Sequence, residues 1–212
     1  MLISGRFHFV SIFLSILLTV IFIHCGKEKG PTAPGVNVSE LVRSGWEFFE
    51  QTPPDYISAL EQFSLALFLN SNSVEAYTGR GWSHARRAFG PNDNKYSLAA
   101  DDFTIAVNRN SKPQVLGDAW AGLALVQLVL NKYEEAVTSA DEALNINADY
   151  VFSHDPEITA VDLKLIKAHA YFFLGEYEKV VLLLDDLQPG VTHPVNQPEV
   201  LLIQLQNLYG SI

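Results

Sequence analysis

The stretch that decides the fold class is GDAWAGLALVQLVLNKYEEAVTSADEALNINADY, residues 117–150. Its second half carries Tyr133 followed by Ala136 and Ala140, and spacings of three and four residues place these side chains on one stripe of a helix. Its first half has the same helical periodicity, with small residues that let a neighbouring helix backbone come close. The stretch therefore predicts two packed helices joined by a short turn.

The second-half pattern, an aromatic residue followed by small or apolar residues three, seven and ten positions on, recurs along the chain. Its four copies begin at Tyr56, Tyr96, Tyr133 and Tyr177. These tyrosines are 40, 37 and 44 residues apart, and the uneven spacing falls in turns rich in helix-breaking residues, such as residues 89–94. A solenoid of stacked repeats tolerates insertions in its turns, because each repeat contacts only its neighbours.

A helix with alternating large and small residues precedes each copy, as in Ala76-Tyr77-x-x-x-Gly81 ahead of Tyr96. With these two signatures, residues 39–188 resemble the tetratricopeptide repeat. The resemblance implies an all-α fold, a right-handed superhelix of about four helix-turn-helix repeats within a solenoid at 39–190. The repeats are expected at 39–72, 73–112, 114–150 and 157–188. Residues 191–212 are expected to add a capping helix for the last apolar face, with a partner-binding tail as the alternative.

The N-terminal residues have a different character. Arg6 is the one charged side chain in residues 1–24, and the run FVSIFLSILLTVIFI from Phe9 to Ile23 has only three polar residues. A basic start followed by such a run is typical of a secretory signal. The junction before Cys25, the only cysteine of the chain, resembles the lipobox of bacterial lipoproteins, although His24 stands where that family has Gly, Ala or Ser.

The lipobox resemblance implies a signal peptide at 1–24, lipid attachment at Cys25 and a flexible, Gly- and Pro-rich tether at 25–38. The protein would then be exported and lipid-anchored to a bacterial membrane, facing the periplasm or the cell surface. Gly26 favours the outer membrane by resemblance to sorting signals. An uncleaved membrane anchor and ordinary secretion are the alternatives.

The net charge, the cysteine content and the absence of catalytic motifs exclude or disfavour several classes of function. The 212 residues carry a net charge of −10, which disfavours nucleic acid as a partner because an acidic surface repels phosphate. One cysteine excludes a disulfide scaffold. The sequence has no Gly-rich phosphate loop, nucleophile elbow or zinc motif, so we expect no enzymatic activity, no cofactor and no metal. His154-Asp155 could suggest a catalytic dyad, but its Asp-Pro step is typical of a turn.

The resemblance also implies that the first helix of each repeat lines a concave groove. The partner-binding residues predicted in this way are Trp46, Phe49, Trp82, Arg86, Leu125, His169 and Phe172. In one interpretation, a partner's helix or extended peptide occupies the groove. In the other, the loop at 149–158 fills it with Tyr150 and Phe152.

These features predict a scaffold or adaptor for protein–protein interaction in the bacterial cell envelope. The alternative function is an envelope module that binds a glycan or another small ligand. In that case Trp46 and Trp82 would stack on sugar faces, which requires that their rings be open to solvent.

Overall fold

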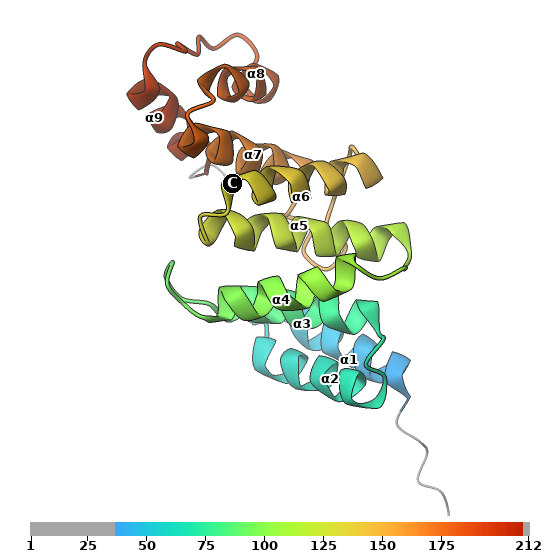
Figure 1. Ribbon diagram of the computed structural model, residues 1–212. Helices are drawn as coiled ribbons and strands as arrows, with labels where there is room; N and C mark the ends of the chain where they lie inside the picture. The colour runs from blue at the N-terminus through green and yellow to red at the C-terminus, as the bar shows by residue number, and fades with distance from the viewer. Residues whose placement is uncertain (1–36, 210–212) are drawn as a thin grey trace, which may run out of the picture. The chain divides into compact units, whose positions relative to one another are not determined.

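The computed structural model describes residues 37–209, which form nine helices. Figure 1 shows these helices stacked as successive antiparallel pairs. The helices are α1 (Val38–Glu50), α2 (Tyr56–Leu69), α3 (Val74–Arg87), α4 (Lys95–Val107), α5 (Pro113–Val129), α6 (Tyr133–Ile146), α7 (Ala160–Leu174), α8 (Tyr177–Leu187) and α9 (Pro198–Tyr209). Within residues 37–209 the one β-type pairing is an isolated bridge between Val151 and Thr159. The predicted all-α repeat solenoid is confirmed.

The helices form an inner and an outer layer. Each inner helix, α1, α3, α5 and α7, contacts the next inner helix as well as its own outer partner. The outer helices α2, α4 and α6 contact inner helices and not one another. This is the arrangement expected when every repeat buries its apolar stripe against the repeat beside it.

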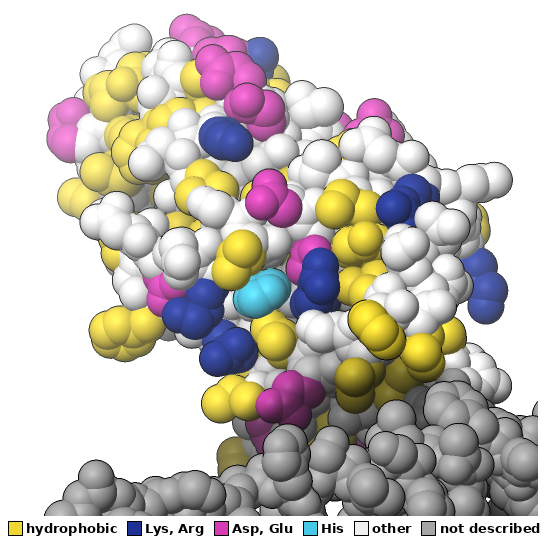
Figure 2. Space-filling view, turned by 60° about the horizontal axis from the view of Figure 1, so that its bottom comes forward, with side chains coloured by type: hydrophobic (Ala, Val, Ile, Leu, Met, Phe, Trp, Pro, Cys, Tyr) yellow, Lys and Arg dark blue, Asp and Glu magenta, His cyan; other side chains and the backbone are white. Residues whose placement is uncertain are grey.

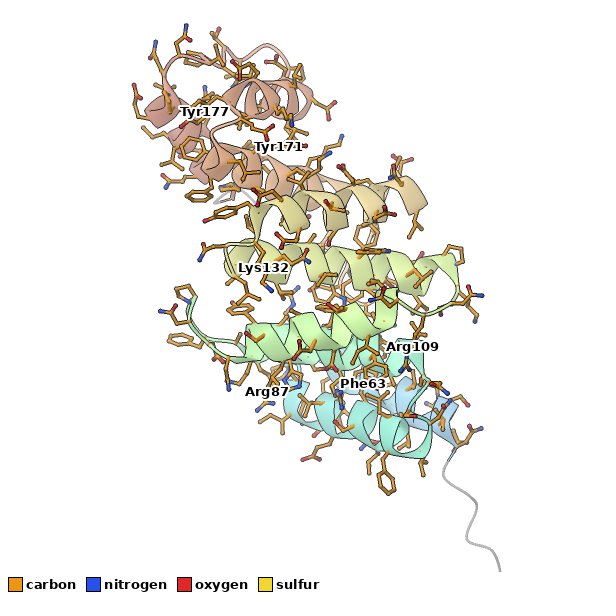
Figure 3. All side chains as sticks on the ribbon, viewed as in Figure 1. Phe63, Arg87, Arg109, Lys132, Tyr171 and Tyr177 are labelled. Atoms are coloured by element: carbon orange, nitrogen blue, oxygen red, sulfur yellow. The ribbon has the colours of Figure 1, made fainter. Side chains whose placement is uncertain are left out.

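Large and small residues determine how closely the layers approach. The ring of Phe63 on α2 fills the space left by Gly45 and Gly79, where an added Cβ would lie within 2.6 and 2.3 Å of the ring. Figure 3 shows Phe63 between the helices of the first two repeats. Phe103 on α4 occupies the equivalent space beside Gly81 and Gly122. A Cβ at any of these glycines would push a buried ring aside, so overpacking would separate the helices.

The segment between α6 and α7 is the longest connection within the four helix pairs. We call its residues 149–158 the strap. Backbone hydrogen bonds fold it into a narrow loop, with Phe152 N–H donating to Ile158 C=O (2.9 Å) and Ala160 N–H donating to Tyr150 C=O (2.7 Å). Thr159 and Asp162 then start α7 with a reciprocal capping box.

The C-terminal helix α9 packs against α7 and α8. Leu201 and Leu205 on α9 are fully buried against Ala168, Val180 and Leu184. The helix therefore covers the apolar face of the last repeat. The predicted signal peptide, Cys25 and nearly all of the tether lie outside the described residues.

Candidate functional site

The strap lies across the inner face of the first three repeats. Phe152 at its centre is fully buried, with its ring centroid 4.5 Å from that of Trp82 in a stacked arrangement. Its centroid is 6.0 Å from that of Trp46 and 6.2 Å from that of Phe49, both edge-on. Residues from α1 and α3 thus meet a residue that follows α6. This reach is unusual in a solenoid, where repeats contact only their neighbours.

Beneath the strap is a buried polar cluster centred on Asp118 of α5. The Tyr150 hydroxyl donates to Asp118 Oδ1 (3.1 Å), and Trp82 Nε1 donates to the Asp118 backbone carbonyl (3.0 Å). Burial raises the pKa of the Asp118 carboxyl from 3.8 to about 7, although its hydrogen bonds from Tyr150, Gln114 and Ser153 oppose the shift. Burial also raises the pKa of Tyr150, so its hydroxyl remains a donor.

The tip of the strap carries His154 and Asp155. The His154 ring lies flat on Trp46, with centroids 3.6 Å apart, and its Nδ1 is 2.5 Å from Glu50 Oε1. Asp155 forms an ion pair with Arg86 at the end of α3. These side chains attach the strap to α1 and α3, which agrees with the structural interpretation of His154-Asp155 rather than a dyad.

The structure separates the predicted groove residues into two groups. Trp46, Phe49 and Trp82 come together, but they are only 5%, 3% and 1% exposed because the strap covers them. The open groove expected at these three residues is therefore absent, and the alternative in which residues 149–158 fill it describes this part of the molecule. The physical reason is the hydrophobic effect. When Phe152 packs against these three rings, apolar surface of all four side chains is removed from water, which is favourable.

The remaining predicted residues occupy different surroundings. Arg86 lies at the edge of the strap. Leu125 is half-buried and packs against the main hydrophobic core. His169 is half-buried, its Nδ1 lies 3.0 Å from Leu165 C=O, and burial lowers its pKa. Phe172 packs against Phe173 and Tyr177. Leu125, His169 and Phe172 line none of the three cavities that border the strap.

The covered tryptophans bear on the glycan alternative. Stacking on a sugar needs an open aromatic face, whereas the Trp46 ring is stacked on His154, makes edge-type contacts with Phe49 and Phe63, and is only 5% exposed. Trp82 is enclosed by Phe103 and Phe152. The observation that would favour a sugar site on these two rings is therefore missing.

Three cavities border the strap, and His154 lines all of them. The first, of about 690 Å³, runs along α1 from Val38 to Glu50, beside the start of α3 and the strap, and we call it the α1 cleft. A second, of about 610 Å³, lies on the other side of the strap beside Arg86 and Tyr56. A third, of about 220 Å³, reaches Asp118 beneath the strap.

The α1 cleft combines apolar walls with negative charge. Half-buried Val38 supplies apolar surface, the largely buried Val42 and Trp46 form the floor, and the exposed Glu47, Glu50 and Glu75 line the cleft as well. Its one lysine or arginine, Arg43, forms an ion pair with Glu47 on the same helix. A cleft with this lining offers contacts to an aliphatic stem that ends in a positive charge.

Sequence reasoning missed Glu75, which lines two cavities, and Asp118, which supports the strap. Glu75 lies one residue before the Ala76-Tyr77 signature, and no periodicity separates it from an ordinary solvated acid. Asp118 is polar within an otherwise apolar stretch, which could have identified it as a buried group that needs a partner.

Among residues 37–209, no cluster of three or more His, Cys, Asp or Glu side chains could hold a metal ion. The same residues include no helix long and apolar enough to cross a membrane.

Comparison with known proteins bears on the fold. No protein-family model and no curated protein matches the sequence. A solved tetratricopeptide repeat protein from Parabacteroides merdae is similar, with a TM-score of 0.53, 15% sequence identity and coverage of 82% of this chain. The match covers 61% of that protein's chain, so the likeness spans about three fifths of its length. Together with the stacked helix pairs, it identifies the fold of this chain as a tetratricopeptide-repeat solenoid.

Proposed function

We propose that the protein is an exported, lipid-anchored scaffold that binds a segment of another protein in the bacterial cell envelope. The tetratricopeptide fold supports the interaction role, since it presents a long inner face on rigid helices. The lipobox-like junction at Cys25 supports the anchor, with the outer membrane as the favoured location. A diacyl anchor with an added amide-linked chain gives firm attachment, because stable anchoring takes more than one acyl chain.

The observation that carries the binding proposal is the α1 cleft. The strap fills the centre of the inner face, so the space for a partner is beside the strap rather than at Trp82. The cleft has half-buried Val38 and the edges of the largely buried Val42 and Trp46 for apolar contact, and three exposed glutamates for charge. We therefore propose an extended, basic segment as the partner, with a Lys or Arg side chain near Glu75. Charge complementarity of this kind favours fast association and excludes acidic competitors.

Photo-crosslinking in the native host tests this proposal. A benzophenone amino acid replaces Glu75, which is exposed at the cleft, and a control probe replaces Glu134, which is exposed on α6. Mass spectrometry identifies the captured peptide. We expect one discrete protein, captured through a basic segment, from position 75 and not from position 134. Capture of acidic segments, or equal capture at both positions, would contradict the proposal.

A matched pair of charge reversals sharpens the test. Glu47→Lys with Glu75→Lys changes the cleft, whereas Glu134→Lys with Glu142→Lys changes the outer face of α6 by the same net charge. Binding of a synthetic peptide copied from the captured segment should weaken about tenfold or more in the first variant, since each charge pair near a protein surface contributes roughly 1 kcal/mol. The second variant should bind within about twofold of the unaltered protein, because exposed charges away from the interface contribute little.

A further inference from the structure

The outer helices of the solenoid differ sharply in polarity. Of the thirteen large hydrophobic side chains that are exposed in the described part of the chain, four lie on α2: Ile57, Leu65, Phe68 and Leu69. Phe68 is 85% exposed. Glu61 is the only charged residue of this helix. Exposed apolar side chains are ordinary when scattered, but a group on one helix is characteristic of a contact surface.

The outer helices farther along the chain are acidic instead. α6 carries Glu134, Glu135, Asp141 and Glu142 and no base. α8 carries three acids and one lysine. Figure 2 shows several acidic side chains toward the upper edge of the described surface, and hydrophobic side chains both at its upper left and at its lower right. The outer surface therefore changes from apolar at the first repeat to negative at the last two.

The apolar end is also the end from which the tether leaves. α1 and α2 are antiparallel and packed together, so the last turns of α2, with Leu65, Phe68 and Leu69, lie beside the start of α1 (Figure 1). Val38, the first residue of α1, is thirteen residues after Cys25. For thirteen residues, the end-to-end distance of a random coil is about 20 Å and that of a fully extended chain is about 45 Å.

We propose that Leu65, Phe68 and Leu69 rest on the surface of the lipid bilayer to which the chain is anchored. The proposal rests on the membrane attachment proposed above. Apolar side chains on an exposed helix face gain free energy by entering the boundary between headgroups and acyl chains. α2 carries one acid and α6 carries four, so anionic headgroups repel the face of α2 less than the face of α6.

Because the chain is tethered, a weak contact between α2 and the membrane is enough to orient the solenoid. Three side chains alone would hold a free protein to a membrane only briefly, but attachment through a short tether keeps them at a high effective concentration near the surface. The solenoid would then stand on its first repeat, which fixes its orientation relative to the membrane.

The test uses the full chain with its native anchor, reconstituted in vesicles of phosphatidylethanolamine and phosphatidylglycerol. An environment-sensitive fluorophore is attached to Phe68→Cys, and to Leu182→Cys as the control, a residue that is 68% exposed on α8. The unaltered protein, whose single cysteine is Cys25, gives the background. We expect blue-shifted emission and quenching by brominated lipids at position 68, several-fold stronger than at position 182.

Each other outcome overturns the proposal in a recognisable way. Protein that sediments with the vesicles but keeps position 68 in water is anchored without this contact. Protein that does not sediment with them lacks the anchor on which the contact depends. Blue-shifted emission without vesicles that rises with protein concentration assigns the face to a second copy of the chain. The Glu75 crosslinking result is independent, so a failed cleft and a failed membrane contact are distinguishable.

Discussion

The first three repeats and the last repeat are built from the same kind of helix pair, but they are held together differently. One continuous core runs from Leu41 on α1 through the first three repeats, includes Phe152 of the strap, and ends on the side of α7 that carries Leu163, Ile166 and Ala170. At the far end, a small separate cluster joins Ala168, Val180 and Leu184 to two leucines of α9. The strap connects residues far apart in sequence, such as Glu50 and His154, whereas α9 only closes the last face.

This difference shows what a solenoid gains from an element outside its repeats. The stability of stacked repeats is a sum of each repeat's own stability and its contacts with neighbours, so one end can open without the other. A strap across three inner helices couples them, because α1, α3 and α5 cannot separate while Phe152, Asp155 and Tyr150 stay docked. We therefore expect perturbations of the strap to spread and perturbations of α9 to remain local.

The largest effect is expected from Phe152→Ala. Truncating this fully buried ring leaves a cavity against Trp46, Phe49 and Trp82 and should lower the free energy of unfolding by about 4 kcal/mol. Urea unfolding measures the loss. Hydrogen exchange should show faster exchange in α1, α3 and α5 together. The neighbouring Val151→Ala, at a 45% exposed site, should cost about 0.5 kcal/mol or less. Faster exchange restricted to residues 149–158 would contradict the coupling.

A slightly smaller and local effect is expected from Leu201→Ala. This leucine is fully buried between α9 and its neighbours, and its truncation should cost about 3 kcal/mol. Because the cluster is separate from the main core, hydrogen exchange should accelerate in α8 and α9 and stay unchanged in α1 and α3. The exposed Ile203→Ala on the same helix is the control. If α1 exchanged faster in the Leu201 variant, the two ends would be one cooperative unit.

The smallest of the three effects is a pH dependence that Asp118 imposes on the strapped end. Its pKa is about 7 in the folded protein and near 3.8 when unfolded, so between these values the folded chain holds a proton that the unfolded chain releases. The contribution of Asp118 to the free energy of unfolding is therefore greatest at low pH. It falls as pH rises, by about 2.5 kcal/mol between pH 5 and pH 8.

The measurement is urea unfolding of the unaltered protein and of Asp118→Asn across that pH range. The asparagine keeps an acceptor for the Tyr150 hydroxyl and cannot ionise, so the difference between the two proteins isolates the carboxyl. The Asp118→Asn substitution should flatten the dependence of the free energy of unfolding on pH between pH 5 and pH 8. Identical slopes in both proteins would show that the Asp118 carboxyl is ionised throughout, or that other groups produce the dependence.

Much of the fold followed from short-range patterns. The tyrosine–alanine landmarks and the large–small alternation predicted helix pairs that the structure contains, with Phe63 and Phe103 filling the spaces at glycines. The candidate site was less accessible. The same aromatic residues, Trp46, Phe49 and Trp82, fit an open groove and a covered one equally well, because helical periodicity tells which face a side chain is on and not what lies against it.

The sequence by itself determined the local units: where helices form, which stripe of each is apolar, and that the chain stacks as a tetratricopeptide-repeat solenoid. These properties depend on residues within about four positions of one another or on one neighbouring repeat. Only the tertiary structure decided that the strap reaches back to α1, and that the α1 cleft remains beside it. Contacts between residues 104 positions apart depend on how the whole stack curves, and the curvature results from packing at every repeat together.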